Sequence, residues 1–388
     1  MTTPDHIIKD LLDQKLPSQG FGLINLVEVP RKTDHHVRLK TIQQILEEFE
    51  SDDSTESRSY LVHIKVNSSP PHLTGATTHS ALAIPSVHDQ VYLPNGKLNS
   101  EFLFQNADLL IAAGDYPLAK NIYRSVLQHG TDTAKALTGL ARCFECEGNF
   151  DRAQSHYEES IAYHATLDGY QKLIALLLKN KKDQYAAESM ERALNLEEIG
   201  DTTRFDLHKA CGNTWVRASN CEKAEQHYRS ALEIRPTADE ILSNLGTLYL
   251  RSNKMSEART AFQEAIISNE KNDKAYIGLG CVLFMLNDKR QAHDYFLKAM
   301  DLDLKNPTAI YYLVKCAYEL RLHGPAEVRL AKYIEVAPVN TNLLYSLAGL
   351  QFHLGKMGEA RQTAERLLQV RPDHTGTLEL LKLIRKYS

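Results

Sequence analysis

The chain has 388 residues, of which 43% are hydrophobic and 24% charged, a composition that excludes wholesale intrinsic disorder. Its 45 basic and 49 acidic residues leave a net charge of −4, too balanced for a protein that depends on phosphate contacts, so no nucleic-acid partner is expected. The 19 glycines and 13 prolines are fewer than turn-rich β architectures need, and this favours helices. No run of 18 apolar residues, no export signal and no disulfide framework occur, which predicts a cytoplasmic protein without direct membrane insertion.

Residues 1–67 are predicted to form a small N-terminal module. Amphipathic helices are expected over residues 6–15 and 36–49, and strand-like runs over residues 23–29 and 60–66 flank the second helix. Strand, helix and strand in this order predict a small α/β unit. This unit would have to pack against the rest of the chain, because two strands alone are marginally stable. The helix over residues 36–49 places its apolar side chains on one face: Leu39, Ile42, Ile45, Leu46 and Phe49.

An extended linker is predicted over residues 68–98, which begin with two serines and two prolines. Beyond it the sequence repeats itself. The repeat is anchored on an alanine that follows a short turn, and successive anchors are 34, 33, 38, 34, 34, 34 and 34 residues apart: Ala119, Ala153, Ala186, Ala224, Ala258, Ala292, Ala326 and Ala360. The 38-residue step, near residues 197–200, leaves two interpretations open, a longer loop or a hinge between two sub-solenoids.

A bulky residue stands four positions after the anchor alanine in seven of the eight units, and a further alanine follows three positions later in the central four. Positions i, i+4 and i+7 share one helical face, so each unit's second helix presents a stripe of small and large side chains. The matching first helices carry pairs such as Leu245-Gly246 and Leu279-Gly280, where a glycine permits close packing. The pattern predicts eight helix–turn–helix units.

This pattern resembles the tetratricopeptide repeat (TPR) family, whose repeat has period 34 with Leu-Gly-x-x-Tyr, then Ala-x-x-x-Phe-x-x-Ala, then Pro. The resemblance covers residues 99–372. It implies an all-α superhelical solenoid of about eight TPR repeats, and residues 373–388 are expected to form the capping helix that a terminal repeat requires.

No catalytic signature is found among the phosphate-binding, dinucleotide-binding, hydrolase and zinc-protease motifs. Cys143 and Cys146 form a Cys-x-x-Cys pair, but no second pair follows at zinc-ribbon spacing and the pair lies within a predicted helix, so a structural role is favoured. Seven of the 16 histidines precede residue 90 at spacings that match no ligand pattern. We therefore expect no enzyme, cofactor or metal. Glycosyltransferase fusions of TPR arrays are also excluded, because too little chain follows the last repeat.

Two groups of residues on the predicted first helices are candidates for partner binding in the concave TPR groove. The first group is Lys209, Asn213, Asn244 and Lys274, whose separations of 4, 31 and 30 residues are similar to those of the carboxylate clamp of TPR co-chaperones. That clamp holds the C-terminal carboxylate of heat-shock chaperones with two lysines, two asparagines and an arginine. Gly278 occupies the arginine position here, so the bidentate fork is missing.

The second group is aromatic and lies in the last two repeats. Aromatic side chains at groove positions bury large areas at low entropic cost and often anchor interfaces, whereas inter-repeat packing is the simpler role for some of them. The candidates for exposure are Tyr311, Tyr345 and Phe352, with Lys315 and His353 beside them and Tyr312 and Tyr318 nearby.

The sequence thus predicts a non-enzymatic scaffold or adaptor that binds partner peptides or helices in the groove. One alternative is a co-chaperone or secretion chaperone that recognises a C-terminal peptide tail through the partial clamp. Another is a regulatory protein whose N-terminal module gates the groove. The partners' identities and the oligomeric state do not follow from the sequence, because fold alone does not decide function.

Overall fold

The computed structural model describes residues 91–337 and 340–387. The predicted strand–helix–strand module, the histidines before residue 90 and most of the predicted linker lie outside these residues. The chain divides at Ile199 and Gly200 into two compact units. We call their described parts the N-terminal unit (residues 91–199) and the C-terminal unit (residues 200–337 and 340–387), and each is described by itself.

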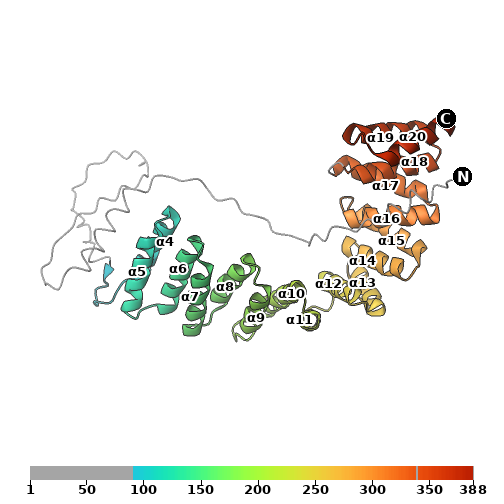
Figure 1. The fold of residues 1–388 in the computed structure, drawn as a ribbon. Coiled ribbons are helices and arrows are strands. Elements are labelled where there is room, and N and C mark those ends of the chain that lie inside the picture. Colours follow the sequence, from blue (N-terminus) through green and yellow to red (C-terminus); the bar gives the residue numbers. More distant parts are fainter. Residues whose placement is uncertain (1–90, 338–339, 388) are drawn as a thin grey trace, which may run out of the picture. The chain divides into compact units, whose positions relative to one another are not determined.

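The N-terminal unit consists of three helix hairpins in which each helix packs against the next (Figure 1). Its helices are α4 (Ser100–Ala113), α5 (Tyr116–Gln128), α6 (Thr133–Cys146), α7 (Phe150–Tyr163), α8 (Leu167–Lys179) and α9 (Asp183–Ala193).

The C-terminal unit continues with five hairpins and one further helix (Figure 1). Its helices are α10 (Asp201–Arg217), α11 (Cys221–Ile234), α12 (Asp239–Arg251), α13 (Met255–Ser268), α14 (Asp273–Met285), α15 (Lys289–Leu302), α16 (Pro307–Leu320), α17 (His323–Val336), α18 (Thr341–His353), α19 (Met357–Val370) and α20 (Thr375–Tyr387). The predicted all-α solenoid class is confirmed for the part of the chain that the structure describes, where the only β pairing is an isolated bridge between Tyr92 and Leu98.

The turn within every hairpin has the same backbone geometry. The residue five positions before each anchor alanine has a positive φ, and it is a glycine in three hairpins, for example Gly114 at 84°. Elsewhere the same place is taken by other residues, such as Asn253 at 58° and Asn287 at 65°. A left-handed residue closes the first helix of a hairpin and redirects the chain, so the repeat period fixes the position of each turn.

The anchor alanines explain why the hairpins stack. All eight are 0% exposed, and the side chains four positions later are also buried, among them Tyr123, Tyr228 and Phe262. These rings lie on first-helix glycines: a Cβ atom at Gly139 would lie 2.1 Å from the Tyr123 ring, and one at Gly212 would lie 2.6 Å from the Tyr228 ring. Close packing of rings on bare backbone therefore fixes the spacing between helices.

The 38-residue step in the repeat falls where the two compact units meet in sequence. Residues 194–200 connect α9 to α10, and α10 has 17 residues whereas the other described helices have 11 to 14. The extra residues therefore lie in a longer connection and a longer first helix.

Residues 91–98, at the end of the predicted linker, are folded back rather than extended. The amide of Asn99 donates to the carbonyl of Val91 at 2.8 Å, and Val91 and Leu98 are each only 7% exposed. Both side chains join the apolar cluster that contains Leu103 and Leu110 of α4. The packed chain thus begins at Val91 at the latest.

Among the described residues, no helix is both long and apolar enough to cross a membrane.

Candidate functional site

In the C-terminal unit, the first helices of consecutive hairpins lie beside one another. α10 contacts α12, α12 contacts α14, and α14 contacts α16, in addition to each helix's own hairpin partner. We call the exposed side of these four helices the first-helix surface. Both groups of residues predicted to bind partners have members here.

Lys209 on α10 is half-buried, and its charge is already paired. Its Nζ atom lies 2.9 Å from Oε1 of Glu240 on α12 and 3.9 Å from a carboxylate oxygen of Asp206. The ammonium group also lies 5.8 Å from the centre of the Phe205 ring. A ligand carboxylate would have to compete with Glu240 for this lysine.

Asn213 and Asn244 are in direct contact. The Nδ2 atom of Asn244 donates to Oδ1 of Asn213 at 3.0 Å, and the hydroxyl of Tyr228 donates to the same oxygen at 2.7 Å. The N-terminal unit has a close parallel, since the Tyr123 hydroxyl donates at 3.2 Å to Asp108, which stands at the same repeat position as Asn213. Asn213 therefore has a structural role within its own hairpin, and only its Nδ2 hydrogens remain for a ligand. We call Lys209, Asn213 and Asn244 the amide cluster.

Lys274 on α14 is exposed and forms no hydrogen bond or ion pair with the amide cluster in the described structure. Four residues further along the same helix is Gly278, where the clamp of co-chaperones has its arginine. A Cβ atom at Gly278 would lie 2.2 Å from Cε1 and Cζ of Phe262, a ring that is 1% exposed. An arginine at this position is therefore incompatible with the packing between these repeats.

An aromatic cluster lies on the neighbouring helices α14, α15 and α16. Tyr312 stacks on Phe296 with ring centres 5.4 Å apart, meets Phe284 edge-on at 5.2 Å and meets Tyr311 edge-on at 5.2 Å. Lys315 places its Nζ atom 5.1 Å from the centre of the Phe284 ring. We call Phe284, Phe296, Tyr311 and Tyr312 the aromatic cluster. Phe296 is buried, and the other three rings and Lys315 are half-buried.

Tyr345 and Phe352 do not belong to this cluster. Tyr345 is only 9% exposed, its ring packs 5.1 Å from His374, and its hydroxyl approaches Gly376 at the start of α20. Phe352 is half-buried and meets the ring of Tyr387 on α20 at 6.2 Å. The expectation that Tyr345 is exposed for partner binding is therefore wrong, because the C-terminal helix covers it.

The sequence analysis missed two residues here. Phe284 belongs to the aromatic cluster through its edge-on contact with Tyr312, and Met285, the next residue in the chain, is 59% exposed. Met285 and Lys274 are eleven residues apart on α14 and therefore share a face of the helix. The unbroken apolar run Val282–Leu286 was the available signal, but it indicates a core helix equally well.

Comparison with known proteins identifies the family. The sequence model of the tetratricopeptide repeat matches residues 110–177 and 216–280. The chain contains TPRs in both of its units, and we call it the TPR protein. No curated protein matches its sequence significantly.

Solved structures that resemble the TPR protein are distant. PilF of Pseudomonas aeruginosa is 20% identical with a TM-score of 0.43, and the alignment covers 55% of this chain and 96% of PilF. YrrB, described as a TPR protein with an unusual peptide-binding site, is 20% identical with a TM-score of 0.40 over 50% of this chain and 99% of YrrB. The first TPR domain of Spaghetti (RPAP3), solved with an HSP90 peptide, is 22% identical with a TM-score of 0.31 over 31% of this chain and 99% of that domain. At these scores the family assignment depends on the sequence model and the repeat register.

The cysteines of the TPR protein do not have the properties of a redox pair. Cys143 is buried, which raises its pKa to about 12, and burial also raises the pKa of Cys146. Both thiols are therefore protonated at neutral pH, whereas reactive cysteines have a depressed pKa.

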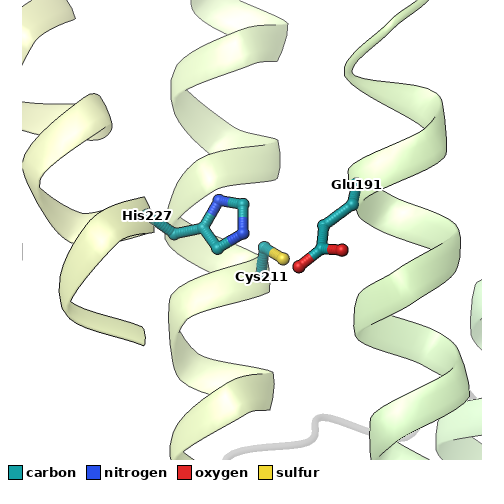
Figure 2. A group of neighbouring side chains, drawn as sticks. All are labelled: Glu191, Cys211 and His227. Carbon is teal, nitrogen blue, oxygen red and sulfur yellow. The ribbon is translucent and has the colours of Figure 1, made fainter. Parts of the chain in front are cut away.

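In the C-terminal unit, a different cysteine, Cys211, lies close to a histidine. Cys211 of α10 and His227 of α11, both drawn in Figure 2, place their ligand atoms within 4.8 Å of each other. On its other side, Nδ1 of His227 lies 3.0 Å from Nδ1 of His208. Glu191, also drawn in Figure 2, belongs to the N-terminal unit. Zinc sites use three or four protein ligands, so Cys211 and His227 by themselves do not form one.

The N-terminal unit of the TPR protein has a hollow of about 460 Å³ that no sequence pattern indicated. The turns after α6 and α8 line it, and its charged groups are paired: Asp151 with Lys182 at 3.1 Å, and Glu147 with Lys120 at 2.7 Å. With these charges already neutralised, the hollow offers no strong recognition for a charged ligand.

Proposed function

We propose that this TPR protein is an adaptor that binds partner proteins through the first-helix surface of its C-terminal unit, with the aromatic cluster as the anchor. The TPR fold supports protein–protein interaction as the general role. The finer proposal concerns which part of the surface carries the binding energy.

The observation that carries the proposal is the aromatic cluster, in which three rings are only half-buried, together with the exposed Met285 that follows Phe284 in the chain. Aromatic rings and methionine are enriched at interfaces, and the aromatic rings bury a large area at little entropic cost. Met285 is 59% exposed, so burying it beneath a partner would release water from an apolar surface. Lys315, held over the Phe284 ring, adds a positive charge beside the apolar area.

This arrangement favours a partner segment with an apolar anchor residue and an acidic residue close to it. Both an extended peptide and an amphipathic helix can offer this combination. The anchor would pack on Tyr311 and Met285, and the carboxylate would approach Lys315.

A peptide-display selection on the full chain, repeated with variants, tests the proposal. The double substitution Tyr311→Ala and Met285→Ala removes the exposed anchors, and Ile267→Ala, which removes an 81% exposed side chain from the second helix α13, is the matched control. We expect selected peptides to lose binding to the double variant and to keep it with the control, while circular dichroism stays unchanged for both. Equal binding by all three proteins would refute the proposal.

Recognition of a C-terminal carboxylate at the amide cluster is a second candidate. Lys274 supports it as an exposed cation, and the unused Nδ2 hydrogens of Asn213 could donate to a carboxylate. The blocked arginine position and the pairing of Lys209 with Glu240 weaken it. If this candidate is correct, amidating the C-terminus of a selected peptide abolishes binding, and the substitution Lys274→Glu does the same.

A further inference from the structure

The first helix of the array, α4, has an outer face that differs from the same face of every later first helix. Leu109 stands ten residues before its anchor alanine and is 51% exposed. The residues at this repeat position in the other seven hairpins are all between 0% and 2% exposed: Cys143, Leu176, Thr214, Leu248, Val282, Cys316 and Leu350.

The neighbouring positions on α4 complete this face. Phe102, Asn106, Leu109 and Ala113 follow at helical spacing and form one stripe, which we call the α4 outer face. In later hairpins the position of Asn106 is taken by leucine or cysteine, and those residues are buried. In α4 the Asn106 amide instead bonds the Phe102 carbonyl at 2.7 Å. The α4 outer face is therefore a repeat-docking face with no helix on it among the described residues.

The other end of the array does have a covering helix. On α20, Thr377, Leu380 and Ile384 are at most 4% exposed, and the helix packs on α18 and α19. The opposite side of α20 is polar and exposed, with Glu379, Lys382 and Arg385. Terminal repeats of a solenoid need such a helix with a polar outer face for solubility.

The described structure begins beside α4. Val91 is packed in the same apolar cluster as Leu103 and Leu110 of α4, so residues 1–90 are joined to the described chain at this helix. Residues 50–90 can span on the order of 100 Å when extended, far more than the length of one helix. The preceding segment is thus held at a high effective concentration close to α4.

We propose that residues 36–49 pack on the α4 outer face as the N-terminal covering helix of the array. The segment has the same length as α4, 14 residues, and its apolar stripe of Leu39, Ile42, Leu46 and Phe49 has the spacing that packs along Phe102 and Leu109. Its other side carries Lys40, Gln44, Glu47 and Glu48, which would give this end a polar exterior as α20 does at the other end. This places the N-terminal region on α4 rather than in the first-helix surface of the C-terminal unit, and leaves that surface open to partners.

Hydrogen exchange followed by mass spectrometry on the full chain tests the proposal through a reciprocal pair of variants. Leu46→Asp alters only the covering segment, and Leu109→Asp alters only α4. We expect residues 36–49 to be protected in the parent protein, and each variant to reduce protection in both segments by about ten- to a hundredfold, the equilibrium equivalent of exposing a buried leucine. Leu378→Asp, on a 41% exposed leucine of α20, is the matched control and should change neither segment.

Rapid exchange of residues 36–49 in the parent protein would overturn the proposal, as would protection there that Leu109→Asp leaves intact. A second copy of the chain is the competing occupant of the α4 outer face. Light scattering over a range of concentrations separates the two: a monomer supports the proposal, and a dimer that Leu109→Asp dissociates overturns it.

Discussion

The first-helix surface of the C-terminal unit carries two clusters that differ in how far the protein itself satisfies them. In the amide cluster, Lys209 is paired with Glu240, and the Asn213 oxygen accepts two hydrogen bonds. In the aromatic cluster, Tyr311, Phe284 and the adjacent Met285 keep apolar area exposed to water. Residues that match a known binding motif can therefore be committed to holding the fold, while residues without a motif remain available to a partner.

The ring of Phe262 lies between Gly246 of α12 and Gly278 of α14, the helices that carry Asn244 of the amide cluster and Phe284 of the aromatic cluster. This ring explains why the arginine of the co-chaperone clamp is absent. The ring also bears on stability, because any side chain at position 278 must displace it.

The largest expected change in stability comes from removing the Phe262 ring. Phe262→Ala should lower the free energy of unfolding by about 3–5 kcal/mol, because the ring is 1% exposed and leaves a cavity. Gly278→Ala should cost about 1–3 kcal/mol in the parent protein through overpacking. In the Phe262→Ala background the same change should be neutral or stabilising, since alanine favours helix over glycine. Urea denaturation of the four proteins measures the coupling, and additive effects would show that the ring does not block position 278.

The next effect concerns Asn213. The substitution Asn213→Ala leaves the buried Tyr228 hydroxyl without its acceptor and should cost about 1–3 kcal/mol of stability. The double variant Asn213→Ala with Tyr228→Phe removes both partners and should recover part of that loss. If Asn213→Ala is neutral for stability and instead weakens peptide binding, the amide cluster is a ligand site.

Lowering the pH should destabilise the fold through His208, which precedes Lys209 of the amide cluster in the chain. Burial, together with the nearby His227 and Arg204, lowers the pKa of His208 from 6.5 to about 4. The unfolded chain therefore takes up the proton first as the pH falls, and the folded state loses stability progressively from about pH 6.5 to pH 4. Because the imidazole is only partly buried, we expect a loss of only about 1 kcal/mol by pH 5.

Thermal melts between pH 7.5 and pH 5 measure this loss. His208→Gln should flatten the pH dependence, and His129→Gln, on an exposed histidine of the N-terminal unit, is the control. An unchanged pH profile for His208→Gln would show that His208 does not contribute.

The smallest effect is expected for the ion pair between Lys209 and Glu240. Glu240→Gln should change stability by less than about 1 kcal/mol, because the pair is partly exposed. It also frees Lys209 for a ligand. We expect no gain in affinity for peptides with a free C-terminus, and a gain that amidation of the peptide removes would instead support carboxylate recognition.

The sequence was sufficient for those parts of the fold that depend on local spacing. Each anchor alanine is 0% exposed, and each hairpin turn has its left-handed residue at a constant distance before that alanine, so period alone located the helices. The site was less predictable. Tyr345 matches the exposed aromatic pattern, but α20 covers it, and the position of a terminal helix is not part of the repeat. Asn213 matches a ligand pattern, yet its acceptor is used by Tyr228, a contact that depends on how two helices face each other.

The most direct test of the central claim is calorimetric titration of one display-selected peptide against Tyr311→Ala and Asn244→Ala. We expect Tyr311→Ala to raise the Kd about tenfold or more, as for loss of an interface anchor, and Asn244→Ala to leave the Kd within about twofold of the parent value. The reverse result, with Asn244→Ala abolishing binding and Tyr311→Ala having no effect, would contradict it and assign recognition to the amide cluster.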